Sequence, residues 1–386
     1  MPNFSIRVVD SLAGVSPDDW DALTEDNPTL KHAWLQSMIE AGCTNAQTGW
    51  LPQFVLLERE VSGATKLAGA VPVYMKGHSY GEYVFDWAWA DAYQRAGLDY
   101  YPKLLCAIPF TPCTGSRLLA ANDADRELLL AAVIQIAKQS DVSSLHILFP
   151  AQDEQALIAA HGFLARQAVQ FHWRNDDYRS FEAFISRMSH DKRKRIKQER
   201  RRVADAGVTL RRVSGTDLTA ADWDFFQRCY QSTYHAHRST PYLNRRFFGL
   251  VGEHMPENIL MVIAEKDGRP VAASLNLVNK TTLFGRYWGA TQFVSGLHFE
   301  ACYYQTIEYC IENGLKLFEG GAQGEHKLAR GFVPVQCTSA HLIKDPRFAN
   351  AVADFLLRES NGIERYVDEL NDHQPYKPTD AAPGAD

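Results

Sequence analysis

The sequence predicts an α/β protein built from two related domains in tandem, each with a mixed β-sheet. Its 386 residues exceed the size of a typical single domain. Both halves show the same order of patterns, namely a β-hairpin, a helix, a strand and a further helix. No Gly-x-Gly-x-x-Gly follows a predicted strand, which argues against a pair of dinucleotide-binding domains. We therefore expect one domain over residues 1–170 and a second over 171–371.

The composition, with 46% hydrophobic and 22% charged residues, is that of a globular protein with a large core. The formal net charge of −6 argues against bulk nucleic-acid binding, although a local basic patch can still bind phosphates. Residues 1–12 lack the basic start and apolar core of a signal peptide. No apolar stretch reaches the roughly 18–20 residues that span a bilayer. We expect a cytoplasmic protein without a membrane span.

The seven cysteines are scattered and odd in number, and they contain no Cys-x-x-Cys pair. This pattern predicts reduced, mostly buried thiols rather than disulfides or a zinc site. No cysteine or serine has a convincing nucleophile–base arrangement, so we expect neither a covalent enzyme intermediate nor a metal.

In the first half, turn and cap signals separate short predicted elements. Ser62-Gly63-Ala64 lies between two β-rich runs, 53–60 and 66–75, and predicts a hairpin. Asn122 or Asp123 is the expected cap of a long helix over 124–140. We also expect strands at 5–9, 103–108 and 144–149, helices at 17–23, 32–40 and 152–161, and an aromatic loop region over 80–101.

The second half begins with a long basic helix over 181–206, which Gly207 ends. Asp267-Gly268 predicts a tight hairpin turn between strands at 259–265 and 270–278. We also expect strands at 208–213, 282–287, 315–319 and 335–343, helices at 220–234, 243–253, 299–313 and 349–370, a short helix before Gly331, and a disordered tail over 372–386.

The segment from Glu319 to Phe332 is the richest in chemically active residues. A predicted buried strand ends at Glu319, and the glycines after it let the backbone approach a ligand closely. Glu325, His326 and Lys327 then fall within one helical turn. Amine acylation needs a base for the attacking amine and a cation or N–H for the oxyanion. A glycine-rich turn with solvated polar side chains explains the same pattern.

Two helices add further candidates. Glu300 and Tyr304 are four residues apart and share one helix face, although packing of the tyrosines and a response of Glu300 to the helix dipole explain them too. The basic helix combines an apolar face with cations elsewhere, so it is either a solvated helix or a phosphate-binding surface for CoA or a tRNA backbone. Its apolar face consists of Phe181, Phe184, Ile185, Met188, Ile196 and Val203.

In the first half, the segment 76–91 is unusually aromatic and contains Tyr80, Asp86 and Trp87. With 109–117 it would wall an acceptor cleft between the domains. An aromatic core beneath a loop is the equal alternative.

Several strings of the sequence are long and specific. They are Tyr-Gly-Glu-Tyr-Val-Phe-Asp from Tyr80, Tyr-Tyr-Pro-Lys-Leu from Tyr100, Pro-Phe-Thr-Pro from Pro109, Gly-Arg-Tyr-Trp-Gly from Gly285, Leu-His-Phe-Glu-Ala-Cys-Tyr-Tyr-Gln from Leu297 and Gly-Ala-Gln-Gly-Glu-His-Lys from Gly321. These strings resemble a bacterial family of predicted N-acyltransferases within the GNAT superfamily, known as FemAB-like or as peptidoglycan biosynthesis/recognition proteins. The likeness covers nearly the whole chain except about the last fifteen residues.

The resemblance implies two tandem GNAT folds, as in the Fem enzymes that transfer amino acids from aminoacyl-tRNA to peptidoglycan precursors. Gly331-Phe332 resembles the Gly-Phe pair that follows the fifth GNAT strand and its helix. Lys327 stands where many acetyltransferases carry a general-acid tyrosine. We therefore expect Lys327 to stabilise the oxyanion, with Glu319 or Glu325 as proton acceptor. The expected catalytic residues are Lys327, Glu319, Glu325, His326 and Glu300.

The resemblance leaves the donor open. Arg286 and Gly289 match the GNAT pyrophosphate pattern Gln/Arg-x-x-Gly-x-Gly/Ala, but Thr291 departs from it. We expect acyl-CoA, the commonest donor of the superfamily, or else aminoacyl-tRNA, as co-substrate and no tightly bound cofactor. The expected donor-binding residues are Arg286, Trp288, Gly289, Gly321, Gln323, Gly324, Lys194, Lys197 and Arg201.

The expected reaction is direct attack of an amine on the activated acyl or aminoacyl group. The acceptor is a small-molecule or peptide amine that the sequence does not identify. The expected acceptor-binding residues are Asp86, Trp87, Tyr80, Tyr303, Tyr304 and His298. The alternative is a non-catalytic double-GNAT module that binds a cell-wall precursor, a nucleotide or RNA.

Overall fold

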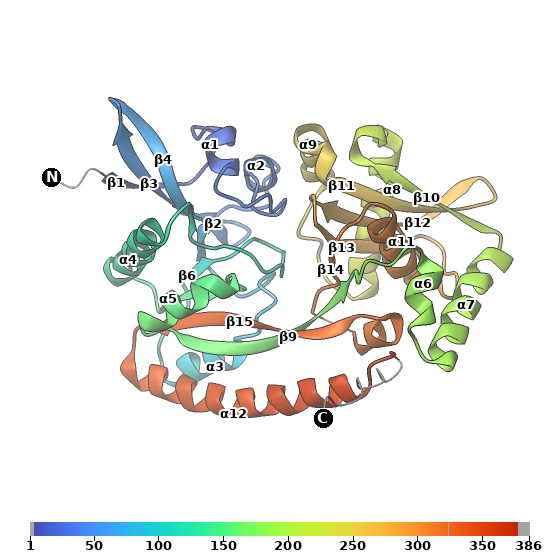
Figure 1. Ribbon diagram of the computed structural model, residues 1–386. Helices are drawn as coiled ribbons and strands as arrows, with labels where there is room; N and C mark the ends of the chain where they lie inside the picture. The colour runs from blue at the N-terminus through green and yellow to red at the C-terminus, as the bar shows by residue number, and fades with distance from the viewer. Residues whose placement is uncertain (1–3, 323, 377–386) are drawn as a thin grey trace, which may run out of the picture. The chain divides into compact units, whose positions relative to one another are not determined.

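The computed structural model describes residues 4–322 and 324–376 (Figure 1). The chain divides into two compact units that are interleaved in sequence, instead of separating once near residue 170. The first unit comprises Met1–Ala168, Thr240–Asn258 and Gln336–Glu364, and the second comprises Val169–Ser239, Ile259–Val335 and Arg365–Asp386. Two strands, β9 (Leu164–Arg174) and β15 (Val333–Ile343), begin in one unit and end in the other.

The first unit contains two sets of paired strands. One is antiparallel, in the order β1-β3-β4-β7, and the other has the order β15-β8-β6-β5-β2, in which only β6 and β8 are parallel. The core lies between the strands and α4, whose Leu129, Leu130 and Val133 are buried. The strands are β1 (Phe4–Val9), β2 (Trp50–Pro52), β3 (Phe54–Val61), β4 (Ala64–Val71), β5 (Val73–Lys76), β6 (Lys103–Cys106), β7 (Leu119–Ala120) and β8 (Ser144–Leu148).

The helices of the first unit are α1 (Pro17–Asp21), α2 (His32–Glu40), α3 (Trp87–Arg95), α4 (Asp123–Gln139), α5 (Gln155–Ala160) and α9 (Arg245–His254), together with short 3₁₀ turns at Gln152–Glu154 and Pro256–Asn258 and most of α12 (Pro346–Asp372). Although α9 follows elements of the second unit along the chain, it packs on α2 through Trp34 and Phe247, whose ring centroids are 5.0 Å apart. This non-local contact explains why 240–258 belongs to the first unit.

The second unit has strands in the order β10-β11-β12-β13-β14-β9. From β10 to β13 the pairing is antiparallel, whereas β13 and β14 are parallel. The strands are β10 (Val208–Ser214), β11 (Ile259–Lys266), β12 (Arg269–Val278), β13 (Thr282–Ala290) and β14 (Leu317–Glu319). The helical segments are α6 (Phe181–Ser186), α7 (His190–Asp205), a 3₁₀ turn at Gly215–Asp217, α8 (Ala220–Ala236), α10 (Leu297–Phe299), the π-helical turn η4 (Glu300–Tyr304), α11 (Gln305–Glu312) and the 3₁₀ helix η5 (Glu325–Arg330).

Local signals in the sequence predicted several elements correctly. Asp267 and Gly268 both have positive φ, 51° and 69°, as the predicted tight hairpin turn requires. Asn122 is the cap of α4, because its side chain accepts a hydrogen bond from the Asp125 N–H. All six apolar residues assigned to one face of the basic helix are buried. The cysteines are unpaired thiols, and all but Cys302 are fully buried.

Other predictions were wrong. The basic helix 181–206 is two helices, because Ser189 has a non-helical backbone (φ −56°, ψ 153°) and its N–H donates to Pro375 O at 2.9 Å. The predicted helix 299–313 is interrupted by the π-helical turn η4. Part of the expected disordered tail is ordered, since the Tyr376 hydroxyl donates to Gly331 O at 2.6 Å, while 377–386 lie outside the described residues. Strand β9 was not predicted, and the residues of α3 were predicted to form a loop.

Gly289 lies where β13 packs directly on α8. A Cβ at this position would lie 1.9 Å from the Cys229 carbonyl oxygen, so two backbones would have to separate. We expect Gly289→Ala to destabilise the protein by about 3 kcal/mol or more. The control is Gly362→Ala in exposed α12, where a Cβ meets nothing within 4 Å. It should stabilise by about 0.5–1 kcal/mol, because alanine favours helices. Urea unfolding of both variants checks this, and a neutral Gly289→Ala would disprove the close contact.

Candidate active site

A cavity of about 110 Å³ opens in the second unit where the pairing of β13 with β14 ends. The two strands pair only from Thr282↔Leu317 to Phe284↔Glu319, and β13 then continues alone on that side. Arg286 is the extra residue of a bulge, because Leu275 is opposite Tyr287 and Asn276 is opposite Gly285. The walls of the cavity include Arg286, Trp288, His298, Cys302, Tyr303 and Gly320.

Glycines allow the chain after β14 to pass close to its neighbours. A Cβ on Gly320 would lie 2.7 Å from the Phe332 ring and 2.9 Å from Phe171 O. Gly331 has φ of +89°, and a Cβ there would lie 2.5 Å from the Phe184 ring. The end of η5 therefore packs closely on the core at Gly331 and Phe332, and Phe332 itself is fully buried.

Lys327 brings a buried cation next to the cavity. Its side chain is 5% exposed, and its ammonium lies 3.4 Å from Gly321 O and 5.6 Å from the centre of the Phe171 ring. Burial lowers the pKa of Lys327 to about 8, and the nearby Cys302 acts weakly in the opposite direction. Lys327 does not line the cavity wall, but its charge lowers the pKa of His298, which does.

Two histidines and a tyrosine form a contiguous group at the same place. The Tyr303 hydroxyl is 3.1 Å from His326 Nε2, and the rings of His298 and Tyr303 are 5.4 Å apart. Burial lowers the pKa of His298 to about 4, and burial together with Arg330 and Lys327 also lowers the pKa of His326. Both imidazoles are therefore neutral at pH 7, and neutral imidazole has a nitrogen that can accept a proton.

The three acids predicted to be catalytic lie in different surroundings. Glu319 ends β14, where its backbone is opposite Phe284 and His172. Glu325 accepts a hydrogen bond from Tyr366 at 2.8 Å and lines a separate hollow of about 230 Å³. Glu300 is buried and forms an ion pair with Arg200 at 3.1 Å. Of these acids, Glu319 lies nearest in sequence to the cavity wall, since Gly320 is part of it.

A buried ion pair that the sequence analysis did not identify holds η5 against α7. Arg330 donates to both carboxylate oxygens of Glu199 at 2.8 Å, and its guanidinium lies 3.4 Å from the centre of the Phe299 ring. Tyr304, predicted to bind the acceptor, is fully buried and donates its hydroxyl to the same carboxylate. Glu199 is one of few acids in the basic helix, and this scarcity is a sequence signal that could have identified it.

The residues predicted to bind the donor lie in three places. Arg286 and Trp288 line the cavity, whereas Gly289 packs on α8. The Gly321 carbonyl accepts from the Phe171 N–H, Gly324 precedes η5 with φ of +103°, and Gln323 lies outside the described residues. A hollow of about 330 Å³ on α7 is lined by Lys194, Lys197 and Arg201 together with His190, Arg193 and Gln198.

The residues predicted to bind the acceptor are divided between the units. His298 and Tyr303 line the cavity of the second unit. Tyr80, Asp86 and Trp87 belong to the first unit, where Asp86 is buried and accepts a hydrogen bond from Tyr100 at 2.6 Å. Tyr80 and Trp87 are exposed, with ring centroids 5.0 Å apart.

Across residues 4–322 and 324–376, no group of three or more His, Cys, Asp and Glu side chains is arranged to hold a metal ion. In the same part of the chain, every helix is too short or too polar to cross a membrane.

Similar folds occur among solved structures. The crystal structure of FemX has a TM-score of 0.56 and 11% identity over 88% of this chain and 98% of that one. L-PGS from Bacillus licheniformis has a TM-score of 0.53 and 10% identity over 89% and 96% of the two chains. A tandem GNAT protein of the clavulanic acid biosynthesis pathway has a TM-score of 0.46 and 12% identity over 89% and 99%. The likeness to FemX and L-PGS shows the fold and confirms the predicted α/β class.

No curated protein sequence matches the chain. Residues 11–378 match the FemAB-like family, which is described as peptidoglycan biosynthesis/recognition. This match supports the predicted enzyme class, a transferase of acyl or aminoacyl groups. The chain belongs to the FemAB-like family.

Proposed function

We propose that the protein transfers an acyl or aminoacyl group from an activated donor to an amine, and that the cavity beside Lys327 holds the reacting carbonyl. The observation that carries the proposal is the buried Lys327 ammonium next to a small cavity with neutral histidines in and beside its wall. A volume of 110 Å³ equals that of three or four waters at about 30 Å³ each, which suits a short acyl or aminoacyl group.

In this proposal the acceptor nitrogen attacks the carbonyl carbon, and the bond to the donor sulfur or oxygen breaks as the tetrahedral intermediate collapses. The Lys327 ammonium stabilises the oxyanion, because a cation in a poorly solvated site interacts strongly with a developing negative charge. The amine proton passes to a neutral imidazole, either that of His298 in the cavity wall or that of His326 beside it. The leaving thiol or hydroxyl takes up a proton in turn.

Direct attack is favoured over a covalent enzyme intermediate. Cys302 is the thiol that lines the cavity, but burial raises its pKa well above the ordinary value. The thiolate is the nucleophilic form of cysteine, so this thiol is inert at neutral pH. The direct route therefore needs only groups in the cavity wall and beside it, namely His298, His326 and Lys327.

Acyl-CoA is the first donor that we propose. Beyond Phe284 the cavity side of β13 is no longer paired with β14, and the Arg286 bulge opens the strand further. A backbone edge of this kind suits the amide groups of an extended donor arm, which can add to it as a strand does.

Aminoacyl-tRNA is the second candidate donor, and α7 is the observation that favours it. The α7 hollow is lined by four lysine and arginine side chains at helical spacing, with His190 and Gln198 completing it. Such a cationic surface suits a phosphodiester backbone. Glu199 of α7 and Arg330 of η5 form an ion pair. A donor bound on α7 would therefore contact a helix that is fixed to η5, the segment that carries Lys327.

Lys327→Ala tests the transfer reaction. We expect kcat to fall by about 10²–10³-fold with a much smaller change in donor KM, because the oxyanion exists only after attack. The assay measures donor consumption over a panel of acyl-CoA thioesters and aminoacyl-tRNAs with small amines. Lys316→Ala, an exposed lysine of the same unit, is the matched control. An unchanged kcat in folded Lys327→Ala, judged by its melting temperature, would exclude this role.

The pH dependence tests the charge state of Lys327. The pKa of the ammonium is about 8, so the charged form dominates below pH 8 and is lost above it. We expect kcat to decline above pH 8 in the wild type, and the decline to move beyond pH 10 in Lys327→Arg, whose guanidinium stays charged. A wild-type rate that instead rises through pH 8 would identify Lys327 as a base and contradict the oxyanion role.

The α7 surface distinguishes the two donors. We expect the double variant Lys194→Ala/Arg201→Ala to lower kcat/KM for aminoacyl-tRNA about tenfold or more and to weaken its salt dependence, because two phosphate contacts are lost. Turnover of acyl-CoA by the same variant should change less than twofold. Equal losses with both donors would show that α7 supports the fold rather than a tRNA.

A further inference from the structure

The first unit contains two lysines that are buried directly opposite each other. Lys76 ends β5 and Lys103 begins β6, and their Cα atoms are partners in the antiparallel ladder. Both side chains are 0% exposed. Like charges directly opposite on paired strands repel, and a buried ammonium is costly unless it is paired. The negative charges come from the segment 77–86, which carries Glu82 and Asp86.

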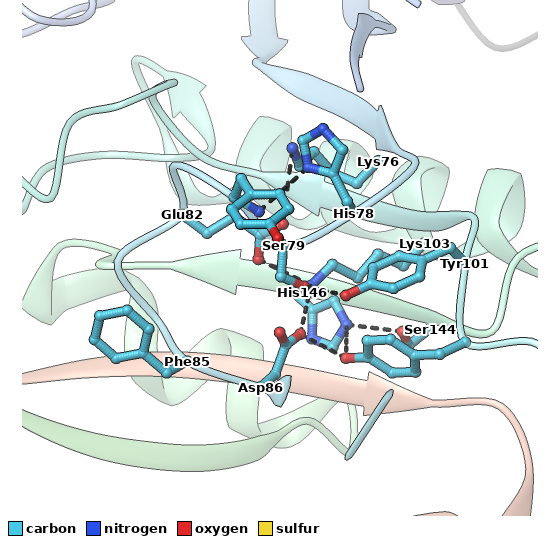
Figure 2. A network of polar contacts seen from close by, with 12 residues as sticks. Lys76, His78, Ser79, Glu82, Phe85, Asp86, Tyr101, Lys103, Ser144 and His146 are labelled. Carbon is cyan, nitrogen blue, oxygen red and sulfur yellow. Dashed lines mark hydrogen bonds and ion pairs between the residues drawn. The ribbon is translucent and has the colours of Figure 1, made fainter. Parts of the chain in front are cut away.

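Figure 2 shows that the segment 77–86 makes more polar contacts to the ammonium of Lys103 than to that of Lys76. Lys103 is fully coordinated, because it donates to Ser79 Oγ at 2.7 Å, to Glu82 Oε2 at 2.8 Å and to Asp86 Oδ2. Lys76 Nζ has no hydrogen-bond partner within 4–322 and 324–376. It lies 3.7 Å from the centre of the Trp50 ring and 3.9 Å from Glu82 Oε1. Lys76 is thus ion-paired with Glu82 but donates no hydrogen bond in the described part of the chain.

Two carboxylate oxygens of the same cluster also lack a hydrogen-bond donor in the described part of the chain, namely Glu82 Oε1 and Asp86 Oδ1. Buried charged groups in proteins normally have their hydrogen bonds satisfied. Here one strong donor and two acceptors remain unsatisfied within a single cluster, although Lys103 beside them is saturated.

We propose that this cluster is a binding site for a free α-amino acid. The ligand carboxylate accepts hydrogen bonds from the Lys76 ammonium, and the ligand ammonium donates to Glu82 Oε1 and Asp86 Oδ1. A group with adjacent positive and negative charges satisfies all three atoms at once. A simple anion would leave the two carboxylate oxygens unmatched, and a simple amine would leave Lys76 unmatched.

The segment above the cluster supplies a place for the ligand side chain. Tyr80, Phe85 and Trp87 are 56%, 61% and 38% exposed, which is unusual for three aromatic residues so close in sequence. The segment is held by the Trp50 indole N–H, which donates to Tyr80 O at 3.1 Å, and by Arg166, which donates to Phe85 O at 2.8 Å. Because the charged groups below are closed off from solvent, ligand entry requires this segment to lift.

This assignment concerns the first unit alone. It holds whether or not Lys327 supports acyl transfer in the second unit, so the two proposals fail independently.

The first experiment measures ligand binding to the full-length protein by calorimetry. The probes are the twenty common L-amino acids and D-alanine, with propionate and ethylamine as matched compounds that lack the ammonium or the carboxylate. We expect saturable binding of at least one amino acid, and at least tenfold weaker binding of both matched compounds. The proposal is overturned if no amino acid binds below 10 mM, or if propionate or ethylamine binds as tightly.

The second experiment removes the unmatched charges. Lys76→Met keeps the length of the side chain and removes the ammonium, and Glu82→Gln keeps the shape and removes the charge. Lys66→Met, at the exposed start of β4, is the control. We expect at least tenfold weaker binding in the first two variants and no loss in the control, with the melting temperature of Lys76→Met unchanged or raised. If Lys76→Met does not fold, Glu82→Gln decides the matter. Wild-type affinity in a folded variant of either site overturns the proposal.

Discussion

The second unit depends on the buried ion pair between Glu199 and Arg330. It joins α7 to η5, and the Tyr304 hydroxyl and the Phe299 ring complete its surroundings. Removal of one partner of such a pair leaves an uncompensated buried charge, at a typical cost of about 3–5 kcal/mol. The position of Lys327, three residues before Arg330, follows from this pair. The same pair makes α7 a structural support of the cavity as well as a cationic surface.

In each unit, the loss of water around a buried lysine lowers the pKa of its ammonium. Burial lowers the pKa of Lys327 to about 8 and that of Lys76 to about 7, in each case as the largest cause. Lys103 shows the opposite outcome, since its two carboxylate partners outweigh burial and raise its pKa. The number of anionic partners, rather than burial itself, therefore decides whether a lysine of this protein is a fixed charge or one that titrates near neutral pH.

Local chemistry was predictable from the sequence, and long-range pairing was not. The Asp267-Gly268 turn, the Asn122 cap and the glycine-rich passage after Glu319 depend on neighbouring residues only. By contrast, β9 contains the polar residues Arg166, Gln167, Gln170 and His172, two of which occupy buried positions. Its sequence therefore lacks the apolar pattern by which a buried strand is predicted. The candidate site needs Tyr303 beside His326 and Glu199 beside Arg330, which are 23 and 131 residues apart. Only the folded chain shows those contacts, and the expected roles of the acids at 300, 319 and 325 stay predictions.

The interleaving of the two units constrains how the protein forms on the ribosome. Since 336–364 belongs to the first unit, that unit is incomplete until residue 364 has been synthesised. Domains usually fold in the order of their synthesis, but this arrangement prevents it. Strand β15, which pairs with β8, is synthesised nearly two hundred residues after β8. The nascent chain must therefore keep an unpaired, largely apolar strand edge protected, and a chain truncated near residue 170 would lose that partner.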